Sequence, residues 1–146
     1  MSTRTEIATA RFLSGYNCAQ AVVYAFRDET GLGEDLALKI PTGLGAGMGR
    51  KQEVCGAVTG GILVLGLRHG RGSTEDPSAT EQTYLRTREL MGRFAAKHGS
   101  CLCRQLLQGY DLATEEGRQR AKADDLLHKV CRPYVQTVVE ILEQIK

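Results

Sequence analysis

Apolar positions are densest between residues 43 and 70, which read GLGAGMGRKQEVCGAVTGGILVLGLRHG. Within this stretch the run from Ile62 to Leu67 is apolar on every side, and such a segment is buried as a strand or as a central helix. The run is too short to cross a bilayer, which needs about 20 apolar residues. We therefore predict a buried central helix over residues 54–69, with Cys55 in its first turn.

One side of this predicted helix carries almost no side-chain atoms, because its residues there are Gly56, Ala57, Gly60 and Gly61. Another helix, or a cofactor, can approach the backbone there, and tight helix packing is the simpler explanation. The alternating glycines at positions 43, 45, 47 and 49 fit either a turn-rich joint or a glycine-laced helix. They lack the lysine and hydroxyl order of a P-loop and follow no strand, which argues against nucleotide binding.

The remaining chain has the spacing of amphipathic helices. We predict helices over residues 3–13, 18–29, 35–40, 77–98, 101–108, 115–130 and from 133 onward. Asn17 and Ser100 are the predicted caps of two of these helices, and Gly99 is a predicted stop. The first helix is expected to bury Ile7, Ala10 and Phe12 or Leu13, and the last to bury Val135, Val138, Val139, Leu142 and Ile145.

No convincing strand pattern is present, so the predicted fold class is all-α. We expect a single domain over residues 1–146, built as a bundle of about six to seven helices around the central helix 54–69. The length of 146 residues, with 42% hydrophobic and 25% charged residues, is that of one ordinary globular domain.

Charge and the amino-terminal sequence narrow the function classes. The formal net charge of +2 is small and the basic residues are scattered among acids, so we expect no nucleic-acid partner. The first residues contain no apolar signal-peptide core, which favours a cytoplasmic protein without a membrane partner. Five cysteines in a reducing compartment are more often metal ligands, redox thiols or inert core residues than a disulfide framework.

All five cysteines fall at or beside predicted helix starts, and they are Cys18, Cys55, Cys101, Cys103 and Cys131. A helix amino terminus presents free N–H groups and about half a positive charge, which stabilises a thiolate. Arg50 and Lys51 precede Cys55 and would lower its pKa further, although a solvated position is the simpler expectation for them. The alternative is that the cysteines are small buried hydrophobic residues.

Positions 101 and 103 point about 200° apart on a helix, so they cannot both serve one site. One of the five cysteines is therefore predicted to be a spare. Four thiolates suit a tetrahedral metal, an iron–sulfur cluster or two disulfide pairs. The chain contains no CxxC, so neither a thioredoxin-type motif nor a ribbon-type zinc site is indicated.

At these residues the chain resembles the four-cysteine redox proteins of the C_GCAxxG_C_C family, which have a CGAxxG motif and three further single cysteines. The motif stands here as Cys55-Gly56-Ala57-Val58-Thr59-Gly60. The single cysteines correspond to Cys18 in GYNCAQA, Cys103 in CRQLL and Cys131 before Pro133. The likeness spans nearly the whole chain and leaves out Cys101, in agreement with the predicted spare.

The resemblance implies redox activity, because the family is called redox-active on account of its cysteines. A related domain occurs in split-Soret cytochromes, which implies that the cysteines can hold an iron–sulfur cluster. Covalent haem is not expected, since the chain has no CxxCH.

The leading hypothesis is a redox protein that uses Cys18, Cys55, Cys103 and Cys131 for disulfide exchange or for electron transfer with an unknown redox partner. In the dithiol version Cys55 is the nucleophile and Cys18 the resolving partner. The competing hypothesis is a non-enzymatic module that binds an iron–sulfur cluster or zinc through the same four cysteines. A third is a scaffold or homodimer in which the cysteines only pack.

Other side chains are assigned smaller roles. Tyr16 and Tyr110 are expected to border the cysteine site. His69, His98 and His128 are each predicted near a helix carboxyl terminus, where a partly charged imidazole is favoured, and none is a predicted ligand.

Overall fold

The computed structural model describes residues 2–146 and is helical throughout, which confirms the all-α fold class. In this described part of the chain the only β-type pairing is an isolated bridge between Val54 and Leu102. The helices, some of them single turns, are α1 Thr3–Leu13, α2 Cys18–Ala25, α3 Arg27–Thr30, α4 Glu34–Lys39, η1 Thr42–Leu44, α5 Gly45–Met48, α6 Gly56–His69, α7 Ser78–His98, α8 Cys103–Leu106, α9 Glu115–Ala123, η2 Leu127–Cys131 and α10 Arg132–Gln144. They are shorter and more numerous than the six to seven that the sequence predicts. None of the described helices is long and apolar enough to span a membrane.

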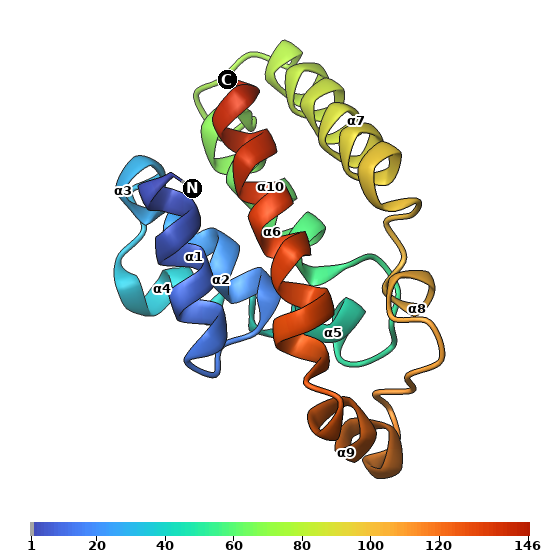
Figure 1. The fold of residues 1–146 in the computed structure, drawn as a ribbon. Helices are drawn as coiled ribbons and strands as arrows, with labels where there is room; N and C mark the ends of the chain where they lie inside the picture. Colours follow the sequence, from blue (N-terminus) through green and yellow to red (C-terminus); the bar gives the residue numbers. More distant parts are fainter. Residues whose placement is uncertain (1) are drawn as a thin grey trace.

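Helix α6 lies inside the bundle and contacts α2, α7 and α10, and α1 packs across α2 and α10 (Figure 1). The predicted central helix is thus present, but it begins at Gly56, so Cys55 is its capping residue and not part of its first turn. Burial is also incomplete, because Leu67 is 47% exposed. The last helix buries all five residues of its predicted face, Val135, Val138, Val139, Leu142 and Ile145.

Local signals set several helix ends as predicted. The Asn17 side chain accepts a hydrogen bond from the Gln20 N–H, and the Gln20 side chain accepts one from the Asn17 N–H, which forms a capping box at the start of α2. Gly99 ends α7 with a left-handed φ of 90°, as a carboxyl-terminal glycine commonly does. The Asp76 side chain accepts a hydrogen bond from the Ser78 N–H at the start of α7.

Three predicted elements are corrected by the structure. Helix α1 buries Thr5, Ala8 and Phe12, and Ile7 packs against the core, so Phe12 and Ile7 are confirmed, whereas Ala10 and Leu13 face solvent and are corrected. The predicted helix 18–29 is divided at Phe26 into α2 and α3.

The third correction lies near the carboxyl terminus. The predicted break at residues 130–133 occurs earlier, between Ala123 and Leu127, where Asp125 has a φ of 54°. From Leu127 the chain runs through the π-helical turn η2 directly into α10.

The glycine run forms neither of the two structures considered for it. Five successive residues, 46 to 50, have φ values between 54° and 71°, so the chain makes a turn of left-handed helix around α5. The Gly49 N–H donates to the Gly45 carbonyl at 3.0 Å, and the Glu53 N–H donates to the Gly47 carbonyl at 2.9 Å. Left-handed turns cost about 1–2 kcal/mol for each non-glycine residue, so Ala46, Met48 and Arg50 are strained.

Candidate functional site

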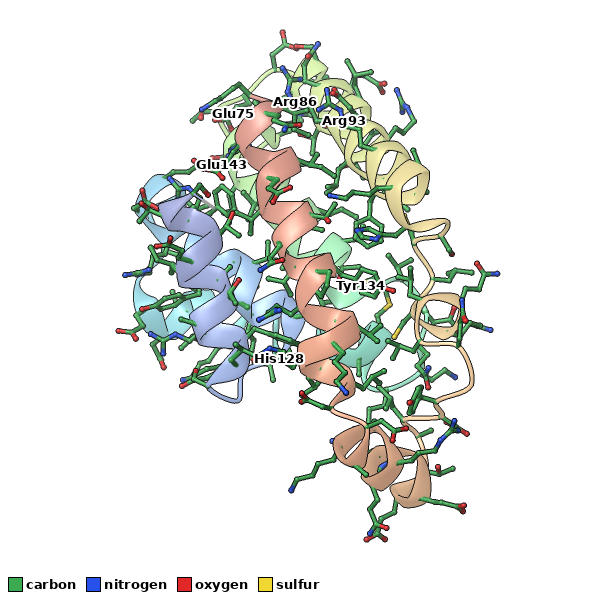
Figure 2. All side chains as sticks on the ribbon, viewed as in Figure 1. Glu75, Arg86, Arg93, His128, Tyr134 and Glu143 are labelled. Carbon is green, nitrogen blue, oxygen red and sulfur yellow. The ribbon has the colours of Figure 1, made fainter. Side chains whose placement is uncertain are left out.

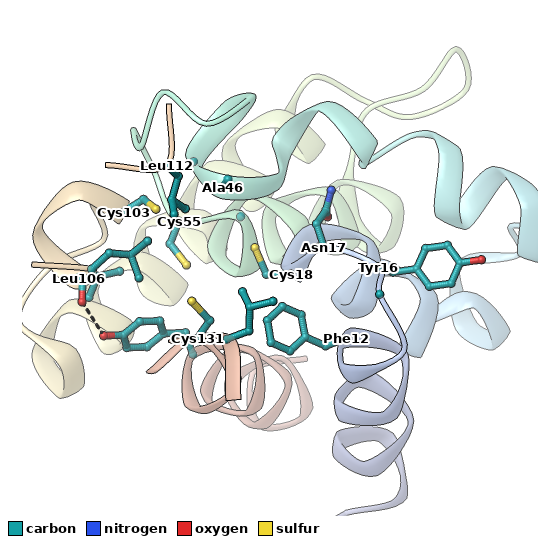
Figure 3. A pocket seen from close by; sticks show the side chains of 16 residues that line it. Phe12, Tyr16, Asn17, Cys18, Ala46, Cys55, Cys103, Leu106, Leu112 and Cys131 are labelled. Carbon is teal, nitrogen blue, oxygen red and sulfur yellow. Dashed lines mark hydrogen bonds between the residues drawn. The ribbon is translucent and has the colours of Figure 1, made fainter. Parts of the chain in front are cut away.

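A cavity of about 220 Å³ opens beside the amino-terminal end of α6, and four of the five cysteines line it (Figure 3). The walls are otherwise mainly apolar side chains and small residues, namely Phe12, Gly15, Tyr16, Asn17, Ala46, Gly47, Gly56, Leu106, Leu107, Leu112, Leu127 and Tyr134. The cysteines are Cys18, Cys55, Cys103 and Cys131, and in Figure 3 their sulfur atoms face a common space. All five cysteines are free thiols in this structure.

The fifth cysteine, Cys101, does not line the cavity. Its thiol instead donates a hydrogen bond to the Met91 carbonyl at 3.4 Å. The side chains of Cys101 and Cys103 therefore point in different directions, and Cys101 is the cysteine left out of the site, as predicted from helix geometry and the family resemblance.

Three of the cavity cysteines lie at free helix starts and the fourth does not. Cys18 and Cys103 are the first residues of α2 and α8, and Cys55 caps α6. Cys131 directly precedes α10, at the junction that the sequence predicts, but η2 runs into α10 without interruption, so this helix start has no free N–H groups.

Backbone pairing fixes Cys55 beside Cys103. The Cys55 N–H donates to the Cys101 carbonyl at 2.7 Å, and the Cys103 N–H donates to the Glu53 carbonyl at 2.6 Å. The buried Gln52 side chain extends this pairing to a third segment, since it donates to the Tyr110 carbonyl and accepts from the Leu112 N–H. Segments distant in sequence are thus held in register by main-chain hydrogen bonds.

The two glycines of the CGAxxG motif explain its spacing. Gly56 and Gly60 are four residues apart and so lie on one face of α6. A Cβ at Gly56 would overlap the Cys18 sulfur, and a Cβ at Gly60 would lie 2.8 Å from the Ala19 carbonyl oxygen. The motif therefore lets α2 approach α6 closely enough to place the Cys18 thiol against the residue after Cys55.

Burial raises the pKa of every cavity thiol, which overturns the predicted thiolate stabilisation. Burial is the main cause at Cys103 and at Cys131, where the pKa is raised to about 12. Burial and then the charge of Cys18 raise the pKa of Cys55 well above its ordinary value. Arg50 and Lys51 are exposed and lie outside the cavity lining, in agreement with the simpler expectation of solvated side chains.

Cys18 differs from the other three thiols in what surrounds its sulfur. Burial raises its pKa too, but the backbone N–H groups of Ala46, Ala19, Cys18 itself and Ala57 act in the opposite direction. The charge of Cys18 in turn contributes to the raised pKa values of Cys55, Cys103 and Cys131. Cys18 therefore interacts with each of the other three thiols, as Cys103 also does, and Cys18 has the larger set of backbone donors.

Of the two tyrosines expected at the site, only Tyr16 lines the cavity, and Figure 3 shows its phenol pointing outward. Tyr110 does not line the cavity, but it packs against the buried cluster that contains Cys103, and its hydroxyl donates to Asp124 at 2.6 Å. The sequence analysis missed Tyr134, whose hydroxyl donates to the Leu106 carbonyl at 3.2 Å. Its position three residues after Cys131 on a helix was the available signal, since residues three apart share a face.

The histidines take no part in the site. His69 and His98 do end helices as predicted, but burial, as the first cause, lowers the pKa of each, so the expected partly charged imidazoles are wrong. His128 lies within η2 and not at a helix carboxyl terminus.

The donor set does not form a ready-made metal site. Across residues 2–146 no group of three or more His, Cys, Asp or Glu side chains is arranged to hold a metal ion. Zinc and iron–sulfur clusters both require about four ligands that converge on one centre. As arranged, the cavity thiols do not fit either group, and no step of the chemistry below passes through one.

Comparison with known proteins agrees with the geometry. Residues 16–145 match the family described as "Putative redox-active protein (C_GCAxxG_C_C)", and this range contains all four cavity cysteines. No curated protein and no solved structure matched the chain. Because the match covers most of the chain and includes the motif whose spacing positions Cys18 against α6, the protein belongs to the C_GCAxxG_C_C family.

Proposed function

We propose that this protein is a thiol–disulfide redox protein whose cavity cysteines alternate between two thiols and one disulfide. The observation that carries the proposal is the convergence of four cysteines from four separate segments on one cavity, while the fifth points away. Those cysteines are 37, 48 and 28 residues apart in sequence (18 to 55, 55 to 103, 103 to 131), so only the fold brings them together. A disulfide needs two adjacent thiols, a weaker demand than the converging ligand set of a metal site.

Cys18 is the attacking thiol in this proposal and Cys55 its partner, the reverse of the roles predicted from the sequence. The support is geometric: the Cys18 sulfur lies against Gly56, and backbone N–H groups from Ala46 and Ala57 surround it. Such groups stabilise a thiolate, as they do an oxyanion. Cys55 has fewer such donors, the N–H groups of Ala57 and Val58, and its pKa is raised well above the ordinary value by burial.

The reaction balances as a two-electron exchange. The Cys18 thiolate attacks one sulfur of a substrate disulfide and releases the other as a thiol, which leaves a mixed disulfide. The Cys55 thiol then loses its proton and attacks the Cys18 sulfur, which releases the second substrate thiol. The protein gains one disulfide, and the substrate gains two electrons and two protons.

Counting thiols against redox potential tests this proposal. Protein equilibrated in buffers of increasing potential should lose two thiols in one step, with an intact mass lower by about 2 Da for each disulfide formed. Cys18→Ser and Cys55→Ser should abolish that step. Cys101→Ser, the matched control two residues from Cys103, should leave it unchanged.

Two results would contradict the proposal. One is a full set of thiols at every potential, and the other is an unaltered oxidation step in Cys18→Ser. Protein purified without oxygen and analysed for iron, zinc and labile sulfide tests the metal-binding alternative, which predicts stoichiometric metal lost with any of the four cysteines. Metal-free protein that forms the disulfide would decide for thiol chemistry.

A further inference from the structure

A second hollow adjoins the cysteine cavity. Both are lined by Ala46, Leu112 and Leu127, so these three residues form a shared wall. Leu127 is 57% exposed, which places the end of that wall at the protein surface. A ligand can therefore lie across Leu127 with one end in each space.

The two spaces differ in charge. The second hollow has a volume of about 420 Å³ and is lined by Arg50, Arg118 and Lys122, with Asp125 as its one acidic side chain. Within residues 2–146 these three basic side chains form no ion pair. The Arg118 guanidinium also donates to the Leu112 carbonyl at 2.9 Å, which holds it beside the shared wall.

The backbone supports this arrangement from both sides. Arg118 and Lys122 lie four residues apart on α9 and so share a face. Arg50 faces the same hollow from the left-handed turn, although a φ of 69° is unfavourable for any residue other than glycine. Strain of this kind accumulates where a position serves a function.

The cysteine cavity, in contrast, has no charged side chain that could pair with a charged ligand. No Lys, Arg, Asp, Glu or His lines it. Its polar side chains are already used internally: Asn17 bonds to Gln20 and Thr42, and Tyr134 bonds to the Leu106 carbonyl. A charge in this apolar space would be desolvated without a partner, which is costly.

We propose that the basic hollow binds the anionic end of a small disulfide whose uncharged sulfur end enters the cysteine cavity. This inference rests on the proposed function and names its substrate class: a low-molecular-weight disulfide that carries carboxylate or sulfonate groups away from the sulfur. The exchange follows the two steps given above, so one substrate disulfide is reduced to two anionic thiols and the protein becomes oxidised.

Matched thiol reagents test the inference on the reduced full-length protein. Methanethiosulfonates transfer an alkylthio group to a thiolate and release methanesulfinate, and they can carry a sulfonate, a neutral propyl or a trimethylammonium tail. Rates at the cavity cysteines, identified by peptide mass, are divided by the rates of the same reagents with a simple alkyl thiol. We expect the anionic reagent to react about threefold to tenfold faster than the cationic one at low salt, and the difference to shrink at high salt.

Variants locate the effect. Lys122→Gln and Arg50→Gln should each reduce the anionic preference about twofold and leave the neutral reagent's rate unchanged. Lys97→Gln, which removes the same charge from α7, should leave all three rates unchanged.

Equal corrected rates for anionic and cationic reagents would overturn the inference, and so would an identical loss in Lys97→Gln. Neither result depends on whether the protein forms an internal disulfide, which the thiol titration measures separately. Anionic preference in a protein that never oxidises would leave the hollow as an anion site and remove the proposed function.

Discussion

Small residues serve different purposes at the first turn of α6 and at the turn that follows it. In the second turn, Gly60 and its neighbour Gly61 lie against the Ala19 backbone and against the Val138 and Leu90 side chains, so the missing Cβ atoms are replaced by close packing. At the start of the helix, the space beside Gly56 holds the Cys18 sulfur, and a cavity remains open next to it. The packed second turn positions α2, and α2 carries Cys18 at its first turn. Rigid packing at one end of a short motif thus sets the geometry of reactive groups at the other.

Side chains cover both ends of the bundle (Figure 2), and the two ends are held in different ways. Arg68, at the far end of α6, donates to the Leu142 and Ile145 carbonyls and so ties α6 to α10. The cysteine end is held instead by the main-chain pairing of residues 52–55 with 101–104 and by a strained left-handed turn. Stability and site geometry therefore depend on different residues, and substitutions can separate them.

The largest loss of stability is expected at Gly47, which lies in α5 and lines the cysteine cavity. A Cβ there would lie 2.6 Å from the Gln52 Cα and 2.8 Å from the Cys103 Cβ, at a φ of 67°. We expect Gly47→Ala to lower the free energy of unfolding by about 3 kcal/mol, as the sum of strain and backbone overlap. Urea unfolding measures this loss. Gly49→Ala is the control, because it has a φ of 62° with open space around it and should cost only about 1 kcal/mol.

Where α6 packs against α2, Gly60→Ala should lower the free energy of unfolding by about 2 kcal/mol, since the new methyl group would meet the Ala19 main chain at 2.8–3.0 Å. Gly66→Ala lies in the same helix with nothing within 4 Å, and it should instead add about 0.5–1 kcal/mol through helix propensity. Urea unfolding should give changes of opposite sign for the two variants if close packing explains Gly60. Equal changes would mean that helix propensity alone sets the effect of both substitutions.

Alkaline pH should lower the free energy of unfolding through the buried cavity thiols. Below pH 9 both folded and unfolded chains keep their thiol protons, so the thiols do not alter stability. Between the ordinary pKa of 9.0 and about 12, the unfolded chain loses protons that folded Cys103 and Cys131 retain, and the free energy of unfolding falls. Each thiol contributes a slope of up to about 1.4 kcal/mol per pH unit.

The measurement is urea unfolding across this pH range in wild type and in Cys103→Ser. The variant lacks one of the two thiols and should therefore show a shallower fall. Identical slopes would mean that other groups, such as lysines, cause the alkaline loss.

The smallest effect on stability is expected at Tyr134, which lines the cavity. Tyr134→Phe removes the hydroxyl that donates to the Leu106 carbonyl and keeps the ring that packs edge-on against Phe94 and His98. A loss of about 0.5–1 kcal/mol should follow. The midpoint of the thiol titration should not move, and a large shift would show that this hydroxyl acts on the cavity thiols.

The predictable parts of the fold are those with local causes. Asn17 and Gly99 set helix ends through their own hydrogen bonds and backbone angles, so the sequence alone located α2 and α7 well. The left-handed turn was missed because three of its five residues, Ala46, Met48 and Arg50, carry no glycine signal. The break near Asp125 was missed for the same reason, since its φ of 54° occurs at a residue other than glycine.

The site divides in the same way. The family resemblance named the four cysteines that line the cavity, and helix geometry indicated that Cys101 and Cys103 do not share one site. The direction of the pKa shifts could not be inferred, because burial depends on walls contributed by Phe12, Leu106 and Leu127 from distant segments. Here the desolvation of the thiols outweighs the helix amino termini on which the prediction relied.

The wide sequence separation of the cavity cysteines has a consequence for folding order. An unfolded chain joins thiols according to loop length, which favours pairs near in sequence such as 101 with 103 or 103 with 131. The pair proposed for catalysis, Cys18 with Cys55, closes a loop of 37 residues and is brought together only when α2 docks on α6. Oxidation before docking would therefore favour loops other than the one proposed for the exchange reaction.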